Sequence, residues 1–147
     1  MPPRTLASDV EPVCAGDGFE ARGQRAEDLA VGLDAAHAHG IIHRDVKPSN
    51  VFITTDYRAI LLDFGIAARP ADGDLTGSGI LGTPWYMAPE QALGESPGPT
   101  TDVWGLAATL YHLITTEPPY GGQLNDVIEQ ILRRDPTPVH QLSLIHI

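Results

Sequence analysis

The sequence predicts an α+β domain that is mainly helical and carries one small β-hairpin. Three segments place apolar residues at helical spacing, and two short runs rich in β-branched residues flank a polar turn. With 147 residues, the chain is long enough for one compact domain but not for two. Its 42% hydrophobic and 19% charged composition is that of a chain that folds rather than one that stays disordered.

The first helix is expected to begin at Arg25 and to stop at Gly40, because glycine commonly ends helices. Its positions at helical spacing are Leu29, Leu33, Ala36 and His37. Asp28 would then fall in the first turn, where a carboxylate interacts favourably with the helix dipole. Residues 1–24 lack a periodic apolar pattern and contain several Pro and Gly residues, so we expect an irregular segment there.

Two short strands are expected next, Val51–Thr54 and Ala59–Leu62, and residues 55–58 should form the turn of a hairpin.

A second helix should be capped by Thr101 or Asp102 and should run to about Thr115. It is apolar on every side, which predicts a buried central helix; the residues concerned are Val103, Trp104, Leu106, Ala107, Leu110, Leu113 and Ile114. A third helix, from Leu124 to Arg134, should bury one face formed by Val127, Ile128, Ile131 and Leu132.

Charge and cysteine content exclude several classes of partner. Nine basic and 19 acidic residues give 9 − 19 = −10, and such a charge repels nucleic acid and anionic lipid. Cys14 is the only cysteine, so no intrachain disulfide can form. No signal-peptide pattern follows Met1, and the longest apolar stretch, Val103–Ile114, is shorter than the ~20 residues that span a bilayer. We expect a cytoplasmic chain without nucleic-acid or membrane contact, although a longer parent protein could carry an anchor elsewhere.

The strongest chemical signal is the segment His43–Asn50, which contains Asp45, Lys47 and Asn50. Phosphoryl transfer needs a carboxylate to orient the attacking hydroxyl, a cation for the moving phosphoryl group and an oxygen ligand for a hard metal ion. This segment supplies all three if the loop folds back on itself. Taken alone, the same residues also fit a solvated turn with an Asx cap.

Three further segments follow in order. Asp63-Phe64-Gly65 comes directly after the second predicted strand, and Asp63 with Asn50 would offer oxygen ligands to Mg²⁺, which accepts few protein groups. By itself this motif also fits a strand end followed by a turn. Thr83–Glu90 comes after a loop rich in Gly, Asp, Ser and Thr, and Asp102–Leu106 opens the central helix. The combination favours phosphoryl transfer over the separate turn interpretations.

On these segments, from Arg25 to Val139, the chain resembles the protein kinase family, and specifically the eukaryotic-like serine/threonine kinases of bacteria. The resemblance implies the mainly helical carboxy-terminal lobe of the kinase fold, with ATP and Mg²⁺ as cofactors. It also implies roles for five residues: Asp45 as the base, Lys47 at the transferred phosphate, Asn50 and Asp63 as Mg²⁺ ligands, and Thr83 beside the acceptor hydroxyl. Lys47 together with Thr83 is typical of serine/threonine rather than tyrosine kinases.

The resemblance also suggests supporting residues. His43 and Phe64 resemble the stacked apolar spine that joins the catalytic loop to the metal-binding motif. Asp102 would hold the backbone of the catalytic loop by hydrogen bonds, or act as a simple helix N-cap, and both roles can hold together. The remaining histidines have neither metal-ligand spacing nor acidic partners in the sequence, and we expect structural or surface roles for His37, His39, His112 and His140.

The chain also departs from the family. The Gly-rich loop, the strand lysine and the paired helix glutamate of kinases are not found before His43, so we expect the amino-terminal lobe to be absent and the chain alone to be inactive. Glu90 is expected to lack the arginine partner that the family supplies further downstream. We expect an incomplete kinase domain over residues 25–141. Residues 142–147 should be a non-native tail, or else a short native strand or tail.

The predicted function of the parent protein is transfer of the ATP γ-phosphate to Ser or Thr hydroxyls of a protein substrate. Two alternatives remain, a non-catalytic kinase-like binding module and a small-molecule phosphotransferase. The intact catalytic set argues against the first, and Lys47 with the Thr83–Glu90 segment argues against the second. We also expect phosphorylation of Thr76 or Ser78, with Arg44 as the group that binds the phosphate.

Overall fold

The structure is a computed structural model that describes residues 4–5, 19–64 and 84–141. Within these ranges the elements are, in chain order, β1 (Arg4–Thr5), α2 (Phe19–His37), η1 (Pro48–Asn50), β2 (Val51–Ile53), β3 (Ala59–Leu61), η2 (Pro84–Tyr86), α3 (Pro89–Ala92), α4 (Pro99–Thr115), α5 (Leu124–Arg133) and η3 (Val139–Gln141). The prediction of a mainly helical domain with one small hairpin is confirmed.

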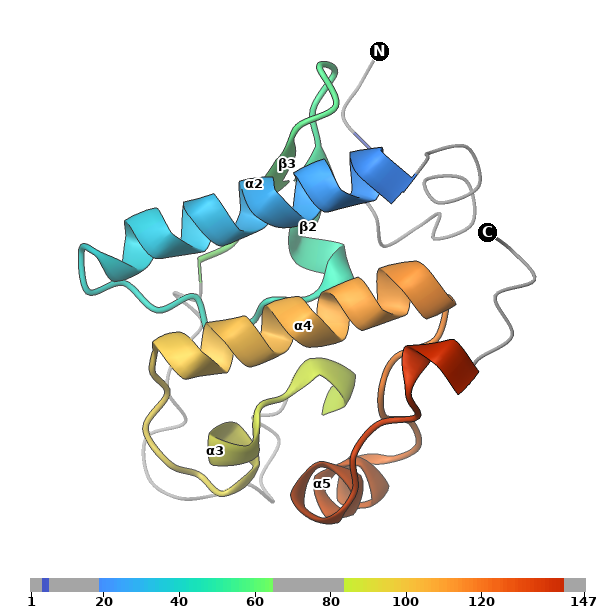
Figure 1. The fold of residues 1–147 in the computed structure, drawn as a ribbon. Helices are drawn as coiled ribbons and strands as arrows, with labels where there is room; N and C mark the ends of the chain where they lie inside the picture. The colour runs from blue at the N-terminus through green and yellow to red at the C-terminus, as the bar shows by residue number, and fades with distance from the viewer. Residues whose placement is uncertain (1–3, 6–18, 65–83, 142–147) are drawn as a thin grey trace.

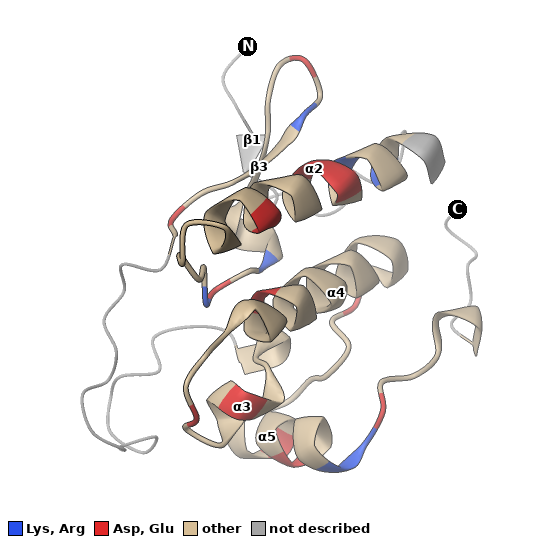
Figure 2. Cartoon of the chain, turned by 60° about the vertical axis from the view of Figure 1, so that its left-hand side comes forward, with Lys and Arg blue, Asp and Glu red and all other residues tan. Residues whose placement is uncertain are grey.

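Helix α4 lies between two layers of the molecule (Figure 1). On one side α2 runs beside it in the opposite direction, and the β2–β3 hairpin packs against α2. On the other side lie α3 and α5. Acidic residues occur in both layers, along α2 and on α3 and α5 (Figure 2). No helix in the described part of the chain is long and apolar enough to cross a bilayer.

The hairpin has the predicted antiparallel register, with Val51 opposite Leu61 and Ile53 opposite Ala59. A third strand, β1, pairs with β2 on its other edge. The expectation of an irregular segment before residue 25 is therefore wrong at β1, and it is wrong again at the start of α2.

Helix α2 begins at Phe19, six residues before the predicted start at Arg25. Gly23 lies inside the helix, because one glycine costs only about 1 kcal/mol relative to alanine and packing against the rest of the domain offsets such a cost. Asp28 consequently lies in the middle of the helix and not in its first turn, so the predicted interaction with the helix dipole is wrong.

Asp28 instead anchors the hairpin to α2. Its carboxylate is buried and accepts hydrogen bonds from Arg58 Nε at 2.9 Å and from the backbone N–H of Ala59 at 3.0 Å, while Arg58 Nη2 lies 2.7 Å from its other oxygen. The hydrogen bond from Arg58 is the largest cause that holds the pKa of Asp28 below its ordinary value, although burial opposes it. The Asp28 carboxylate therefore joins the start of β3 to α2.

Helix α4 ends at Thr115, as predicted, but its cap and its burial differ from the prediction. The N-cap is Gly98, whose N–H donates to Thr101 Oγ1 at 3.0 Å, so neither Thr101 nor Asp102 occupies the cap position itself. Val103 and Ile114 are 60% and 37% exposed, so the helix is not buried on every side.

The core has two parts. One cluster joins Leu29 of α2, Val51 and Ala59 of the hairpin and the partly buried Leu106 and Leu113 of α4. The other contains Tyr120, Val127 and Ile131, with the partly buried Trp85, Met87 and Trp104 packed against it. On α5 the predicted apolar face is thus buried at Val127 and Ile131, whereas Leu132 is 43% exposed, contrary to the prediction.

Candidate active site

The loop between α2 and β2 brings together three of the predicted catalytic residues. Lys47 Nζ lies 2.8 Å from Asp45 Oδ2, and Asn50 Nδ2 donates to the same oxygen at 3.1 Å and to the Asp45 carbonyl at 2.7 Å. Asn50 is buried, while the Asp45 side chain is 51% exposed. The loop therefore folds back as the sequence predicted, and it presents a carboxylate to solvent over a buried amide.

Local sequence explains this turn. Pro48 opens the short helix η1, and its fixed φ suits a first helical position. The turn closes with a hydrogen bond from Asn50 N–H to the Lys47 carbonyl at 3.0 Å.

A close approach of α4 holds the middle of the loop. Val46 is 3% exposed, and a Cβ added at Gly105 would lie 2.9 Å from both the Cβ and the carbonyl oxygen of Val46. Those distances are below van der Waals contact, so glycine is required at this crossing. The sequence prediction included Gly105 in a motif but assigned it no role.

Asp102 holds the start of the loop from α4. Its side chain is fully buried and accepts hydrogen bonds from the backbone N–H of His43 at 2.8 Å and of Arg44 at 2.7 Å. The prediction that Asp102 holds the backbone of this loop by hydrogen bonds is confirmed. A buried carboxylate is tolerated here because several donors satisfy it.

His37 was wrongly expected to lack an acidic partner. Its Nε2 lies 2.7 Å from Asp102 Oδ2, the oxygen that also accepts from His43 N–H. Its position in the last turn of α2 was visible in the sequence, but the partner is 65 residues away, and only the packing of α2 against α4 brings the two together.

His43 connects the loop to the segment that contains Asp63. Its Nδ1 accepts from Asp45 N–H at 3.3 Å, so the proton resides on Nε2, which donates to the Leu62 carbonyl at 3.0 Å. The ring also packs against Phe64, with centroids 4.7 Å apart and an interplanar angle of 55°. The predicted contact between His43 and Phe64 is confirmed, although the rings are tilted rather than stacked.

Asp63 follows β3 with an exposed side chain and a φ of 56°. A non-glycine residue in this left-handed region stores strain, which is common at functional sites. The N–H of the preceding Leu62 donates to the Asn50 carbonyl at 2.8 Å and fixes Asp63 relative to Asn50. Within the described ranges, no group of three His, Cys, Asp or Glu residues is arranged to hold a metal ion.

Several predicted residues lie outside the described part of the chain: Gly65, Thr76, Ser78, Thr83 and residues 142–147. The structure therefore does not place the predicted acceptor-site threonine, the predicted phosphorylation sites or the predicted non-native tail.

Glu90, which was expected to lack its arginine, accepts hydrogen bonds from hydroxyl groups of α4. Thr101 Oγ1 lies 2.5 Å and Thr100 Oγ1 lies 3.5 Å from Glu90 Oε1. The side chain is half-buried, so these donors offset part of the cost of removing the carboxylate from water.

The segment that precedes α3 is fixed at two points. Tyr86 Oη and His112 Nδ1 are 2.5 Å apart and their rings are nearly parallel, while Trp85 Nε1–H donates to the Gly122 carbonyl at 3.2 Å. Burial raises the pKa of Tyr86 to about 12 and lowers the pKa of His112. No pattern in the sequence connects these residues.

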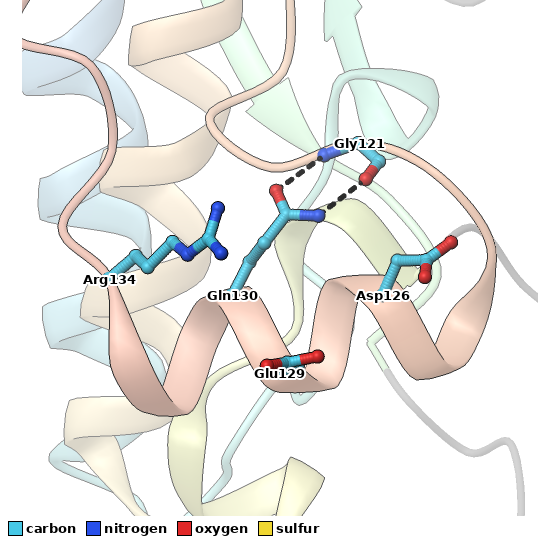
Figure 3. A pocket seen from close by; sticks show the side chains of 5 residues that line it. All are labelled: Gly121, Asp126, Glu129, Gln130 and Arg134. Carbon is cyan, nitrogen blue, oxygen red and sulfur yellow. Dashed lines mark hydrogen bonds between the residues drawn. The ribbon is translucent and has the colours of Figure 1, made fainter.

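A separate open pocket of about 300 Å³ lies beside α5 (Figure 3). Gln130 Nε2 donates to the Gly121 carbonyl at 2.7 Å across it, and Asp126, Glu129 and Arg134 complete its lining. Asp126 accepts from Gln123 N–H and Glu129 contacts Arg133, so these carboxylates are engaged within α5. Of the predicted catalytic residues that the structure describes, Asp45, Lys47 and Asn50, none lines this pocket.

Comparison with known proteins decides the family. The protein kinase domain family matches residues 19–143. The chain belongs to the protein kinase family. It is 42% identical over 118 residues to the serine/threonine-protein kinase PknB of Mycolicibacterium smegmatis, a match that covers 76% of this chain and 18% of that protein.

Two further kinase relatives show the same extent of similarity. PknD of Mycobacterium tuberculosis is 42% identical over 114 residues, which cover 75% of this chain and 17% of PknD. PknB of Mycobacterium leprae is 40% identical over 117 residues, which cover 78% of this chain and 19% of that PknB. The predicted resemblance to serine/threonine kinases is confirmed. The chain spans about a fifth of the length of the curated kinases it matches.

Proposed function

We propose that this chain supplies the catalytic loop of a kinase that transfers the γ-phosphate of ATP to Ser or Thr hydroxyls of a protein. The observation that carries the proposal is the convergence on one oxygen: Lys47 and Asn50 both contact Asp45 Oδ2, which leaves the other carboxylate oxygen for a substrate hydroxyl. A cation and an amide beside an exposed carboxylate form the arrangement that phosphoryl transfer requires.

In the proposed reaction, Asp45 accepts the proton of the substrate hydroxyl while the hydroxyl oxygen bonds to the γ-phosphorus. The bond between that phosphorus and the oxygen bridging it to the β-phosphate breaks, and ADP leaves with the electron pair. Lys47 would move from Asp45 toward the transferred group and offset its negative charge. Thr83 is proposed to line the site of the acceptor hydroxyl.

Asn50 and Asp63 fit a role as Mg²⁺ ligands. The side-chain amide of Asn50 directs its nitrogen toward Asp45, so its side-chain oxygen points the other way. Asp63 has an exposed carboxylate and follows Leu62, whose N–H donates to the backbone carbonyl of Asn50. Mg²⁺ prefers such oxygen ligands and retains several waters. When bound, it would neutralise charge on the phosphates of ATP.

A protein substrate is the proposal that the relatives support, since each is named a serine/threonine-protein kinase. We also propose that residues 25–141 are part of one kinase domain and that the lobe covering the nucleotide lies outside this chain. A chain without that lobe should bind ATP too weakly to turn it over.

The test is a chimera in which residues 19–141 replace the matching segment of the M. smegmatis PknB kinase domain. Asp45→Asn should abolish phosphate transfer to a generic protein substrate but leave nucleotide binding intact. Asp63→Asn should weaken Mg²⁺-dependent nucleotide binding as well, and Asp34→Asn on the exposed surface of α2 serves as the matched control. Equal activity of the Asp45→Asn and Asp34→Asn proteins would contradict the proposal.

A further inference from the structure

We propose that Gln91 is a positioning residue for Asp45, a role that rests on the proposed function of Asp45 as the base. Gln91 lies in the four-residue helix α3, on the far side of α4 from the hairpin. Its Nε2 nevertheless donates to the backbone carbonyl of Arg44 at 2.9 Å. This carbonyl belongs to the same rigid peptide unit as the N–H of Asp45.

The orientation of the Gln91 amide is fixed by its other end. Gln91 Oε1 accepts from the backbone N–H of Ala88 at 3.0 Å, so only one of the two amide orientations satisfies both contacts. A carboxylate of the same shape could accept from Ala88 but could not donate to Arg44. Glutamine is therefore the residue type that this bridge requires.

The bridge acts on a strained point of the catalytic loop. Arg44 has a φ of 69°, a left-handed conformation that a non-glycine residue keeps only when its surroundings enforce it. Asp102 binds the N–H of Arg44, Gln91 binds its carbonyl, and His43 Nδ1 accepts from the N–H of Asp45. Each of the two peptide units that precede the Asp45 side chain is thus held by a different element.

Gln130 offers a matched control elsewhere in the chain. It makes the same kind of two-sided amide bridge, because its Nε2 donates to the Gly121 carbonyl at 2.7 Å and its Oε1 accepts from Gly121 N–H at 3.4 Å. Both glutamines lie near a helix end and bind a loop, yet only Gln91 contacts the catalytic loop. Gln130→Glu should therefore reproduce any general effect of losing such a bridge.

The experiment is two-dimensional ¹H–¹⁵N NMR with amide hydrogen exchange on the 147-residue chain, for Gln91→Glu, Gln91→Met and Gln130→Glu. We expect both Gln91 variants to shift the Asp45 amide resonance and to speed its exchange by about two- to tenfold. Gln130→Glu should leave the Asp45 amide resonance unchanged, even if it lowers the urea midpoint of unfolding as much as the Gln91 variants do.

An unchanged Asp45 amide in Gln91→Glu would overturn the proposal. If the Asp45 amide then changed in Gln91→Met and not in Gln91→Glu, the pattern would assign Gln91 only to the cap of α3, because the glutamate keeps the bond to Ala88 N–H and methionine does not. This measurement does not depend on phosphate transfer, whereas the proposed function fails only if Asp45→Asn remains active in the chimera. The two failures are therefore distinguishable.

Discussion

On the α2 side of α4, buried carboxylates bind the backbone, whereas on the α5 side aromatic rings stack and bury apolar surface. Asp28 and Asp102 accept hydrogen bonds from backbone N–H groups of the hairpin and of the His43–Asn50 loop. Opposite them, Trp104 and Tyr120 lie nearly parallel with centroids 6.4 Å apart, and Trp85 packs against the same cluster.

The two kinds of contact constrain the chain in different ways. Hydrogen bonds to carboxylates are directional and fix individual peptide groups, here those of the loop that carries Asp45. Aromatic and apolar burial is less directional, and it stabilises an arrangement of helices without fixing single backbone groups. The comparison predicts that the two sides respond differently to substitution.

The largest effect is expected from Asp102→Ala, which removes the buried acceptor of two backbone N–H groups and of His37. We expect a loss of about 3 kcal/mol or more in the free energy of unfolding, measured by urea denaturation. Asp126→Ala is the control, because Asp126 accepts one N–H at the exposed start of α5. Asp126→Ala should lower the free energy of unfolding by about 1 kcal/mol. Equal losses in Asp102→Ala and Asp126→Ala would remove the distinction between the two sides.

A smaller effect is expected from Tyr120→Leu on the aromatic side. It removes the stacking with Trp104 and the hydrogen bond from Tyr120 Oη to the Arg134 carbonyl, and should cost about 2 to 3 kcal/mol in urea denaturation. The amide resonances of the catalytic loop should stay in place, since no directional contact to that loop is lost. Tyr57→Leu, at a side chain that is 72% exposed, should be nearly neutral.

A gain in stability is expected from Thr109→Val on α4. Thr109 is fully buried, and its hydroxyl has no hydrogen-bond partner among the described residues. Valine has nearly the same shape without the polar atom, so the free energy of unfolding should rise by about 1 kcal/mol. Thr115→Val is the contrasting variant, because Thr115 Oγ1 donates to the Glu117 carbonyl at 2.7 Å, and it should lose stability.

The smallest effect is a pH dependence at His112. Burial lowers the pKa of His112, so the folded state disfavours the charged form relative to the unfolded chain. This contribution to stability is fully present above the ordinary value of 6.5 and is lost as the pH falls from there through the lower folded pKa. Urea midpoints measured from pH 7.5 to 5 should show a smaller decline in His112→Gln than in the unmodified chain.

His39→Gln provides the comparison for that measurement, since His39 is exposed and its Nδ1 lies 2.8 Å from the backbone carbonyl oxygen of Ala35. Its pH dependence should match that of the unmodified chain. An identical decline in all three proteins would show that the Tyr86–His112 contact carries no pH-dependent stability.

The sequence by itself determined most of the elements and the grouping of the polar residues in the loop between α2 and β2. Helical spacing and the β-branched runs predicted α4, α5 and the hairpin within a few residues, because local periodicity reflects which face each element buries. The grouping of Asp45, Lys47 and Asn50 could also be predicted, since they lie within six residues and one turn brings them together.

Only the tertiary structure decided which distant groups hold that loop. His37 meets Asp102, Gln91 meets Arg44, and Gly105 makes room for Val46 across separations that no local pattern encodes. The same holds for Asp28, which the local pattern placed at a helix start and which the fold places against Arg58. Side chains on different elements meet only when those elements pack, and packing depends on the whole set of buried surfaces rather than on neighbours in the sequence.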